Sequence, residues 1–179
     1  TFIGRLINGK GVKDLIYAIN NLNQKNIVCF IVGDGPEKKD LEKEVISLKL
    51  ENKIYFFGFR PVNEAIGILK ISDIFINPSY TEGLPTTVIE AGLCKKPIIA
   101  TRVGGTNEII IDGKSGFLIK PKDIKDLKEK IEILSSNPTL RKIFGETAFE
   151  DCCSKFNWNS NIEKFILILN KTKKCMKIK

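Results

Sequence analysis

Short apolar runs alternate with longer polar segments along the first two thirds of the chain. The runs are rich in β-branched and aromatic residues and are apolar at nearly every position, which is typical of strands covered on both faces. They predict strands at residues 2–4, 27–32, 54–57, 74–76, 97–100 and 117–119.

The segments between these runs have a helical period. Val12, Leu15, Ile16, Ile19 and Leu22, for example, form one apolar stripe at spacings of three and four. Helices are predicted over residues 12–22, 36–50, 61–72, 85–94, 124–134, 139–150 and about 157–170.

This alternation predicts a single α/β domain over residues 1–179. Its core is a Rossmann-like parallel sheet of about six strands with helices on both faces, followed by C-terminal helices. Ligands of such sheets bind in the loops at the carboxyl ends of the strands. The content of those loops therefore decides what the domain can bind.

Composition excludes several classes of site. The chain has no histidine, which rules out Ser-His-Asp triads and HExxH zinc sites within it. The sequence lacks both a run of about 18 apolar residues and the layout of a signal peptide. The five cysteines (Cys29, Cys94, Cys152, Cys153 and Cys175) form no CxxC pair, which favours thiols in a reducing cytoplasm over disulfides or metal ligands.

The net charge of +8 at pH 7 could indicate nucleic acid or an anionic membrane as a partner. Lysines are scattered along the chain, however, and the aromatic residues lie mainly in predicted strands, which argues against a nucleic-acid binder. Only residues 171–179 concentrate positive charge. A solvated tail is favoured there, with peripheral contact to an anionic membrane as the alternative.

The loop after the first predicted strand carries two cations beside glycines. Arg5 follows Gly4, and Lys10 precedes Gly11 at the start of a predicted helix. A guanidinium fork, an ammonium group and a helix N-terminus together suit a diphosphate. Ordinary surface cations beside a turn are the alternative reading.

Glycines also follow the next strands. Gly33 and Gly35 precede Pro36 and an amphipathic segment, which favours a strand-to-helix loop open to a ligand over a hairpin. Arg60 stands just before the third predicted helix. The pair at positions 104–105 suits either close backbone approach or a plain loop.

The loop after the fourth strand holds two glutamates, Glu82 and Glu90, on either side of Pro85. If Pro85 opens the helix, the backbone amides of Thr86, Thr87 and Val88 are free to meet an anion. Glu90 then lies among apolar neighbours, where a carboxylate needs a partner or a cavity. Two ordinary acids near a helix start are the alternative.

Taken in order, these motifs resemble the nucleotide-sugar-binding half of the retaining glycosyltransferases of family 4, which have the GT-B fold. The matching segments are Gly4-Arg-Leu, Lys10-Gly, Gly33-Asp-Gly-Pro36, Phe57-Gly-Phe-Arg60, Asn77-Pro-Ser79, the Glu82 and Glu90 pair, residues 97–108, Gly113 with Gly116, and Phe156-Asn-Trp158. The resemblance covers nearly the whole chain.

The resemblance implies a role for each charged residue. Arg5 and Lys10 match the cations that neutralise the donor diphosphate. Glu82 matches the glutamate that holds hydroxyls of the transferred sugar, and Glu90 the one that binds the ribose. Relatives are thought to retain configuration by front-face substitution, so Glu82 is not expected to be a nucleophile. No metal or other cofactor is expected, because the two cations supply the charge and no Asp-x-Asp run accompanies them.

The resemblance also implies backbone contacts with the donor, and Arg60 is expected to flank the nucleobase. Donor-binding positions are expected at Gly4, Gly33, Gly35, Gly83, Leu84, Thr86 and Thr87. The sequence departs from many relatives, which have an extra glycine before Leu-Pro, as in EGFGLP. Here the run is Glu82-Gly-Leu-Pro.

Family members have a second, N-terminal domain that binds the acceptor, and the resemblance implies that this chain lacks it. We expect the chain to be the donor-binding half of an enzyme that moves a sugar from a nucleotide-diphosphate sugar to a glycan or lipid-linked acceptor. Its expected location is the cytoplasm, at or near the inner face of a bacterial membrane. The alternative is a non-catalytic module that binds a nucleotide sugar or a partner protein.

Overall fold

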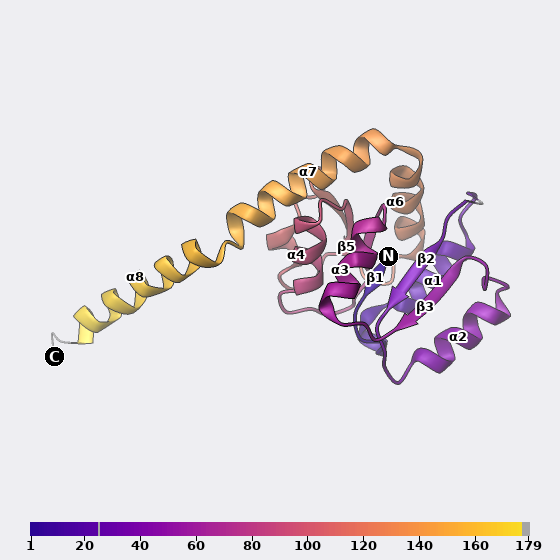
Figure 1. Cartoon of the computed structure of the whole chain (residues 1–179), viewed down its shortest axis with the longest axis horizontal. Helices are drawn as coiled ribbons and strands as arrows, with labels where there is room; N and C mark the ends of the chain where they lie inside the picture. Colours follow the sequence, from indigo (N-terminus) through magenta and orange to yellow (C-terminus); the bar gives the residue numbers. More distant parts are fainter. Residues whose placement is uncertain (25, 177–179) are drawn as a thin grey trace.

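The computed structural model describes residues 1–24 and 26–176. Its strands are β1 (Phe2–Ile3), β2 (Cys29–Val32), β3 (Ile54–Gly58), β4 (Phe75–Asn77), β5 (Ile98–Thr101) and β6 (Gly116–Ile119). Each coincides with a predicted strand, and all of the strand pairs are parallel. The predicted α/β architecture is therefore confirmed (Figure 1).

The strands form two three-stranded sheets, β1-β2-β3 and β4-β5-β6. Among the described residues, no strand of one sheet pairs with a strand of the other. Thr1 nevertheless joins the sheets: its amine donates to the Ile74 carbonyl at 2.8 Å, and its carbonyl accepts from the Ile76 amide at 2.9 Å. The spatial order is thus β3-β2-β1-β4-β5-β6, and the direction of winding reverses between β1 and β4. Parallel sheets bind their ligands at such a reversal.

The predicted helices are all present. They are α1 (Val12–Asn20), α2 (Lys38–Ser47), α3 (Val62–Ile71), α4 (Thr86–Leu93), α6 (Ile124–Ser136), α7 (Pro138–Lys155) and α8 (Trp158–Met176). Two short elements were not predicted, namely the 3-10 turn η1 (Asn8–Lys10) and α5 (Thr106–Ile109). Each is too short to show a helical period.

The buried apolar residues form two clusters on opposite faces of the strands. Ile98 and Ala100 belong to one cluster and Ile99 to the other, as the alternation of side chains along a strand requires. Helices α1, α2 and α6 contribute to the cluster that holds Ile99, and α3, α4 and α5 to the other. Both faces of the sheet are covered, which explains why the strands read as continuous apolar runs.

Helix α8 extends away from the rest of the domain (Figure 1). Its apolar side chains include Phe165 and Leu167, each 61% exposed. Among the described residues, no helix has the length and apolar character that crossing a bilayer requires. The basic segment at residues 171–179 falls within α8 up to Met176, and residues 177–179 lie outside the described part of the chain.

Four cysteines whose side chains are described are free thiols. Cys29 and Cys152 are buried, as expected for small apolar side chains, whereas Cys153 is exposed. Burial raises the pKa of the Cys29 thiol and raises that of Cys152 to about 11, so both stay protonated at neutral pH.

Candidate functional site

The loops after β1 and β4 meet at the point where the winding of the sheet reverses. The Tyr80 amide donates to the Gly9 carbonyl at 2.8 Å. Gly11 has a φ of +65°, and a Cβ there would lie 2.1 Å from the Pro78 carbonyl oxygen. The two loops can touch because position 11 has no side chain.

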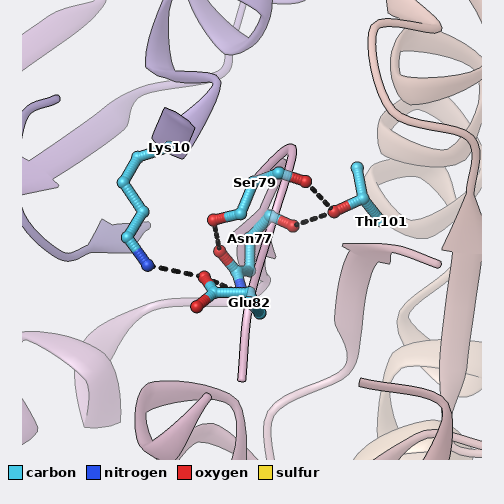
Figure 2. Close-up of polar contacts among 5 residues, drawn as sticks. All are labelled: Lys10, Asn77, Ser79, Glu82 and Thr101. Carbon is cyan, nitrogen blue, oxygen red and sulfur yellow. Dashed lines mark hydrogen bonds and ion pairs between the residues drawn. The ribbon is translucent and has the colours of Figure 1, made fainter. Parts of the chain in front are cut away.

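This contact brings Lys10 to Glu82, as Figure 2 shows. The Lys10 ammonium lies 2.7 Å from Glu82 Oε1, and the two side chains are 21% and 10% exposed. Both residues were predicted from the sequence to belong to the site. The structure thus joins one of the predicted cations to one of the predicted carboxylates.

Glu82 stays ionised despite its partial burial. Burial alone raises the pKa of this carboxyl, but the hydrogen bond and positive charge of Lys10, together with the neighbouring Ser79 and Asn77 side chains, act in the opposite direction. Together they lower the pKa of Glu82 below its usual value of 4.5. The carboxylate is therefore a hydrogen-bond acceptor at neutral pH.

The lowered pKa of Glu82 predicts how the free energy of unfolding depends on pH. A carboxyl group whose pKa is lower in the folded than in the unfolded chain contributes stability above the unfolded-state pKa of 4.5 and loses it as the pH falls through the folded-state pKa. We expect Glu82→Gln to be less stable than the wild type at neutral pH and the difference to shrink toward pH 3. Urea denaturation between pH 3 and pH 7 measures it. A difference that is constant over this range would contradict the lowered pKa.

Three buried polar side chains lie beneath Glu82, namely Asn77, Ser79 and Thr101, which are 3%, 0% and 1% exposed. Asn77 Nδ2 donates to Glu82 Oε1 at 3.4 Å, and Ser79 Oγ donates to Asn77 Oδ1 at 2.7 Å. Thr101 Oγ1 donates to the Ser79 carbonyl. The sequence analysis gave these side chains no individual role. Their signal was a polar residue at the carboxyl end of each of two neighbouring apolar strands, β4 and β5.

The glycine pair after β5 admits the loop that carries Glu82. A Cβ at Gly104 would lie 2.0 Å from the Glu82 carbonyl oxygen, and the Gly105 amide donates to the Gly83 carbonyl at 2.6 Å. The sequence left open whether this pair allows close approach or forms a plain loop. Close approach is confirmed, and the approaching group is the protein's own backbone.

Helix α4 begins at Thr86, with Pro85 as its N-cap and no side chain capping it. Within the described part of the chain, the amides of Thr86 and Thr87 have no acceptor, as predicted. The prediction for Val88 was wrong, because its amide donates to the Pro85 carbonyl at 3.1 Å. Two free amides thus remain at the positive end of the helix dipole.

In the part of the chain that the structure describes, Glu90 and Arg5 have no side-chain partner. Glu90 is half-buried on the second turn of α4, and Arg5 is exposed in the loop that also holds Lys10. Neither side chain makes a hydrogen bond or ion pair with any described residue. A half-buried carboxylate and an unpaired guanidinium are both available to a ligand.

The glycines after β2 lie against the Arg5 loop. A Cβ at Gly33 would lie 1.8 Å from the Gly4 carbonyl oxygen, and one at Gly35 would lie 2.3 Å from that of Leu6. The structure therefore gives these glycines a role in shaping the loop that carries Arg5. Their direct contact with a donor stays a prediction.

The remaining predicted positions are open to solvent. Gly83 and Leu84 are exposed, and an added Cβ at Gly83 would meet no atom within 4 Å. Arg60 is exposed as well and lies 3.7 Å from the Glu64 carboxylate one helical turn away. Over residues 1–24 and 26–176, no three His, Cys, Asp or Glu side chains are arranged to hold a metal ion.

Comparison with known proteins finds glycosyltransferases, both by family model and by individual relatives. The family model of the glycosyl transferases group 1 matches residues 1–151. An uncharacterized glycosyltransferase of Methanocaldococcus jannaschii is 36% identical over 168 residues, covering 92% of this chain and 43% of the relative. The D-inositol 3-phosphate glycosyltransferase of Corynebacterium jeikeium is 31% identical, covering 90% of this chain and 41% of the relative.

Among solved structures, HepE from Anabaena in complex with UDP superimposes with a TM-score of 0.88 at 25% identity. The match covers 95% of this chain and 48% of HepE. The chain thus spans about half the length of the proteins that it matches.

Proposed function

The chain belongs to the glycosyl transferases group 1 family, and we propose that it binds the nucleotide-diphosphate sugar from which such an enzyme transfers a sugar. The observation that carries this proposal is the contact between Lys10 and Glu82 at the reversal of the sheet. It joins a cation that suits a diphosphate to a carboxylate that suits sugar hydroxyls. The UDP complex of the structurally similar HepE supports a nucleotide ligand.

The diphosphate is the leaving group, and its negative charge grows as the glycosidic bond breaks. Arg5 and Lys10 meet that charge, together with the free amides of Thr86 and Thr87 at the start of α4. Lys10 and the two amides are fixed before the reaction, so they stabilise the transition state more than the ground state. With two cations in this role, we propose that transfer needs no metal ion.

The two carboxylates bind hydroxyl groups in this proposal. Glu82 accepts from the transferred sugar and Glu90 from the ribose. Glu82 is already ion-paired with Lys10, which weakens it as a nucleophile and leaves it suited to accepting hydrogen bonds. The sugar is then transferred with retention of configuration by front-face attack of the acceptor, without a covalent enzyme intermediate.

The acceptor is bound by a part of the enzyme outside this chain. The chain covers 43% of the M. jannaschii relative, which leaves room there for a second domain. We propose a glycan or lipid-linked acceptor at the inner face of a membrane. The name of one relative, the putative teichuronic acid biosynthesis glycosyltransferase of Bacillus subtilis, supports a role in making a glycan. The alternative function is a module that binds the nucleotide sugar without turnover.

Calorimetric titration with UDP, GDP and ADP tests donor binding. We expect one of the three to bind and Arg5→Ala to weaken its binding about 10- to 100-fold, the effect of losing a charged hydrogen bond. Lys142→Ala, which removes an exposed charge from α7, is the control and should bind like the wild type. Failure of all three nucleotides to bind, or tighter binding of a single-stranded oligonucleotide, would refute the proposal.

A further inference from the structure

Buried polar side chains are concentrated in one place in this domain. Of the five buried polar residues in the described part of the chain, three are Asn77, Ser79 and Thr101, directly beneath Glu82 (Figure 2). Burying a polar group costs free energy unless it is hydrogen-bonded. The Ser79 and Asn77 side chains are hydrogen-bonded to each other, and Thr101 donates to the backbone carbonyl of Ser79, so that the group bridges the carboxyl ends of β4 and β5.

The hydrogen bonds in this group fix which atom of each side chain donates. Thr101 must donate its hydroxyl proton, because the Ser79 carbonyl can only accept. The Ser79 hydroxyl donates to Asn77 Oδ1, which fixes the orientation of the Asn77 amide. The amide nitrogen of Asn77 is thereby turned toward Glu82 Oε1, at 3.4 Å. With the amide reversed, two oxygens would face each other.

Two donors therefore reach the same oxygen of Glu82. One is the Lys10 ammonium at 2.7 Å, which comes from the diphosphate side of the site, and the other is the buried Asn77 amide. A half-buried glutamate on a loop has several side-chain rotamers, and two opposed donors restrict it to one. The carboxylate is then held in place before a ligand arrives, which lowers the entropic cost of binding.

We infer that Asn77, Ser79 and Thr101 are positioning residues that hold the Glu82 carboxylate oriented for recognition of the transferred sugar. The inference rests on the proposed role of Glu82 in donor binding. The inference distinguishes the contribution of the sugar to donor affinity from that of the diphosphate. Disturbing the buried group should weaken binding of the sugar, while the diphosphate keeps its contacts with Arg5 and with the start of α4.

The first experiment is independent of any nucleotide. NMR titration of the Glu82 carboxyl should show a higher pKa in Ser79→Ala and in Thr101→Val than in the wild type, because the first change releases the Asn77 amide and the second releases the backbone of Ser79, which positions the hydroxyl that holds this amide. Thr101→Ser keeps the hydroxyl and should restore the wild-type value. Ser115→Ala removes another fully buried serine hydroxyl, which accepts from the Ile111 amide, and should leave Glu82 unchanged. An unchanged Glu82 titration in both Ser79→Ala and Thr101→Val would overturn the inference.

The second experiment compares each nucleoside diphosphate with its sugar: UDP with UDP-glucose, GDP with GDP-mannose, and ADP with ADP-glucose. For the pair that the wild type binds, Ser79→Ala should weaken the nucleotide sugar about tenfold and leave the nucleoside diphosphate within about twofold. Equal weakening of both would overturn the positioning role. If the wild type binds no pair, the proposed function fails, and the NMR titration still decides whether the buried group orients Glu82.

Discussion

Lys10→Met should reduce sugar transfer by the intact enzyme about 100- to 1000-fold, the cost of removing one preorganised group that stabilises the charge of a leaving group. Lys10 is held 2.7 Å from Glu82, so its ammonium is in place before the donor binds. Methionine keeps an unbranched side chain and lacks the ammonium group, so it removes the charge and the hydrogen bond to Glu82 while leaving most of the packing. The rate should fall more than the donor affinity, because the charge on the diphosphate is greatest in the transition state.

The rate is measured as release of nucleoside diphosphate by the intact protein, and the affinity by calorimetry. Lys13→Met is the matched control, because Lys13 lies in the next helix, is 57% exposed and pairs with Glu44 at 3.6 Å. It should keep wild-type activity. A Lys10→Met enzyme that also works at the wild-type rate would remove Lys10 from the mechanism.

The double variant Lys10→Met/Glu82→Gln separates stability from function. Lys10→Met alone leaves a half-buried carboxylate without its cation, which destabilises the fold. Glutamine at position 82 removes that unpaired charge, so the double variant should recover part of the lost stability. Its transfer rate should stay low, because neither the diphosphate cation nor the sugar carboxylate is restored.

Gly104→Ala should disrupt the site through the backbone. The new Cβ would lie 2.0 Å from the Glu82 carbonyl oxygen and 2.8 Å from that of Gly83, so the loop that carries Glu82 has to move. The left-handed conformation at Gly104, with φ of +51°, adds a strain of about 1 kcal/mol or more for alanine. We expect a total loss of about 3 kcal/mol in the free energy of unfolding, together with loss of nucleotide-sugar binding.

Gly113→Ala is the control for this variant. Gly113 has a similar φ of +74°, but an added Cβ would meet no atom within 4 Å. It should therefore show the backbone strain without the collision, and it should still bind the donor. Urea denaturation and calorimetry on both variants make the comparison. Equal stability and equal donor binding in the two would contradict the role assigned to the close approach at Gly104.

The fold could be predicted because its strands are buried on both faces and its helices on one face, and each kind of burial leaves its own pattern in the sequence. Strands such as β5, buried at all four residues, read as unbroken apolar runs, and α1 shows one apolar stripe. The turn η1 and helix α5 were missed because three or four residues do not make a period. The link between the two sheets could not be foreseen either, since it depends on the backbone of Thr1 alone.

The site was predicted in part. The residue types at Arg5 and Lys10 indicated a diphosphate, the family resemblance assigned hydroxyl groups to Glu82 and Glu90, and the structure brings Lys10 and Glu82 together. Glycine patterns were less informative, because a glycine indicates that something approaches its backbone without saying what. At Gly104 the approaching group is the loop of Glu82, a contact that only the folded chain reveals.

The most direct test of the central claim is an NMR titration that follows the backbone amides as a nucleoside diphosphate is added. If the donor lies where the loops after β1 and β4 meet, the largest shifts should fall on residues 4–10 and on Thr86 and Thr87, and Lys10→Met should weaken them. Shifts confined to other surfaces, or an unchanged spectrum with UDP, GDP and ADP alike, would contradict the account.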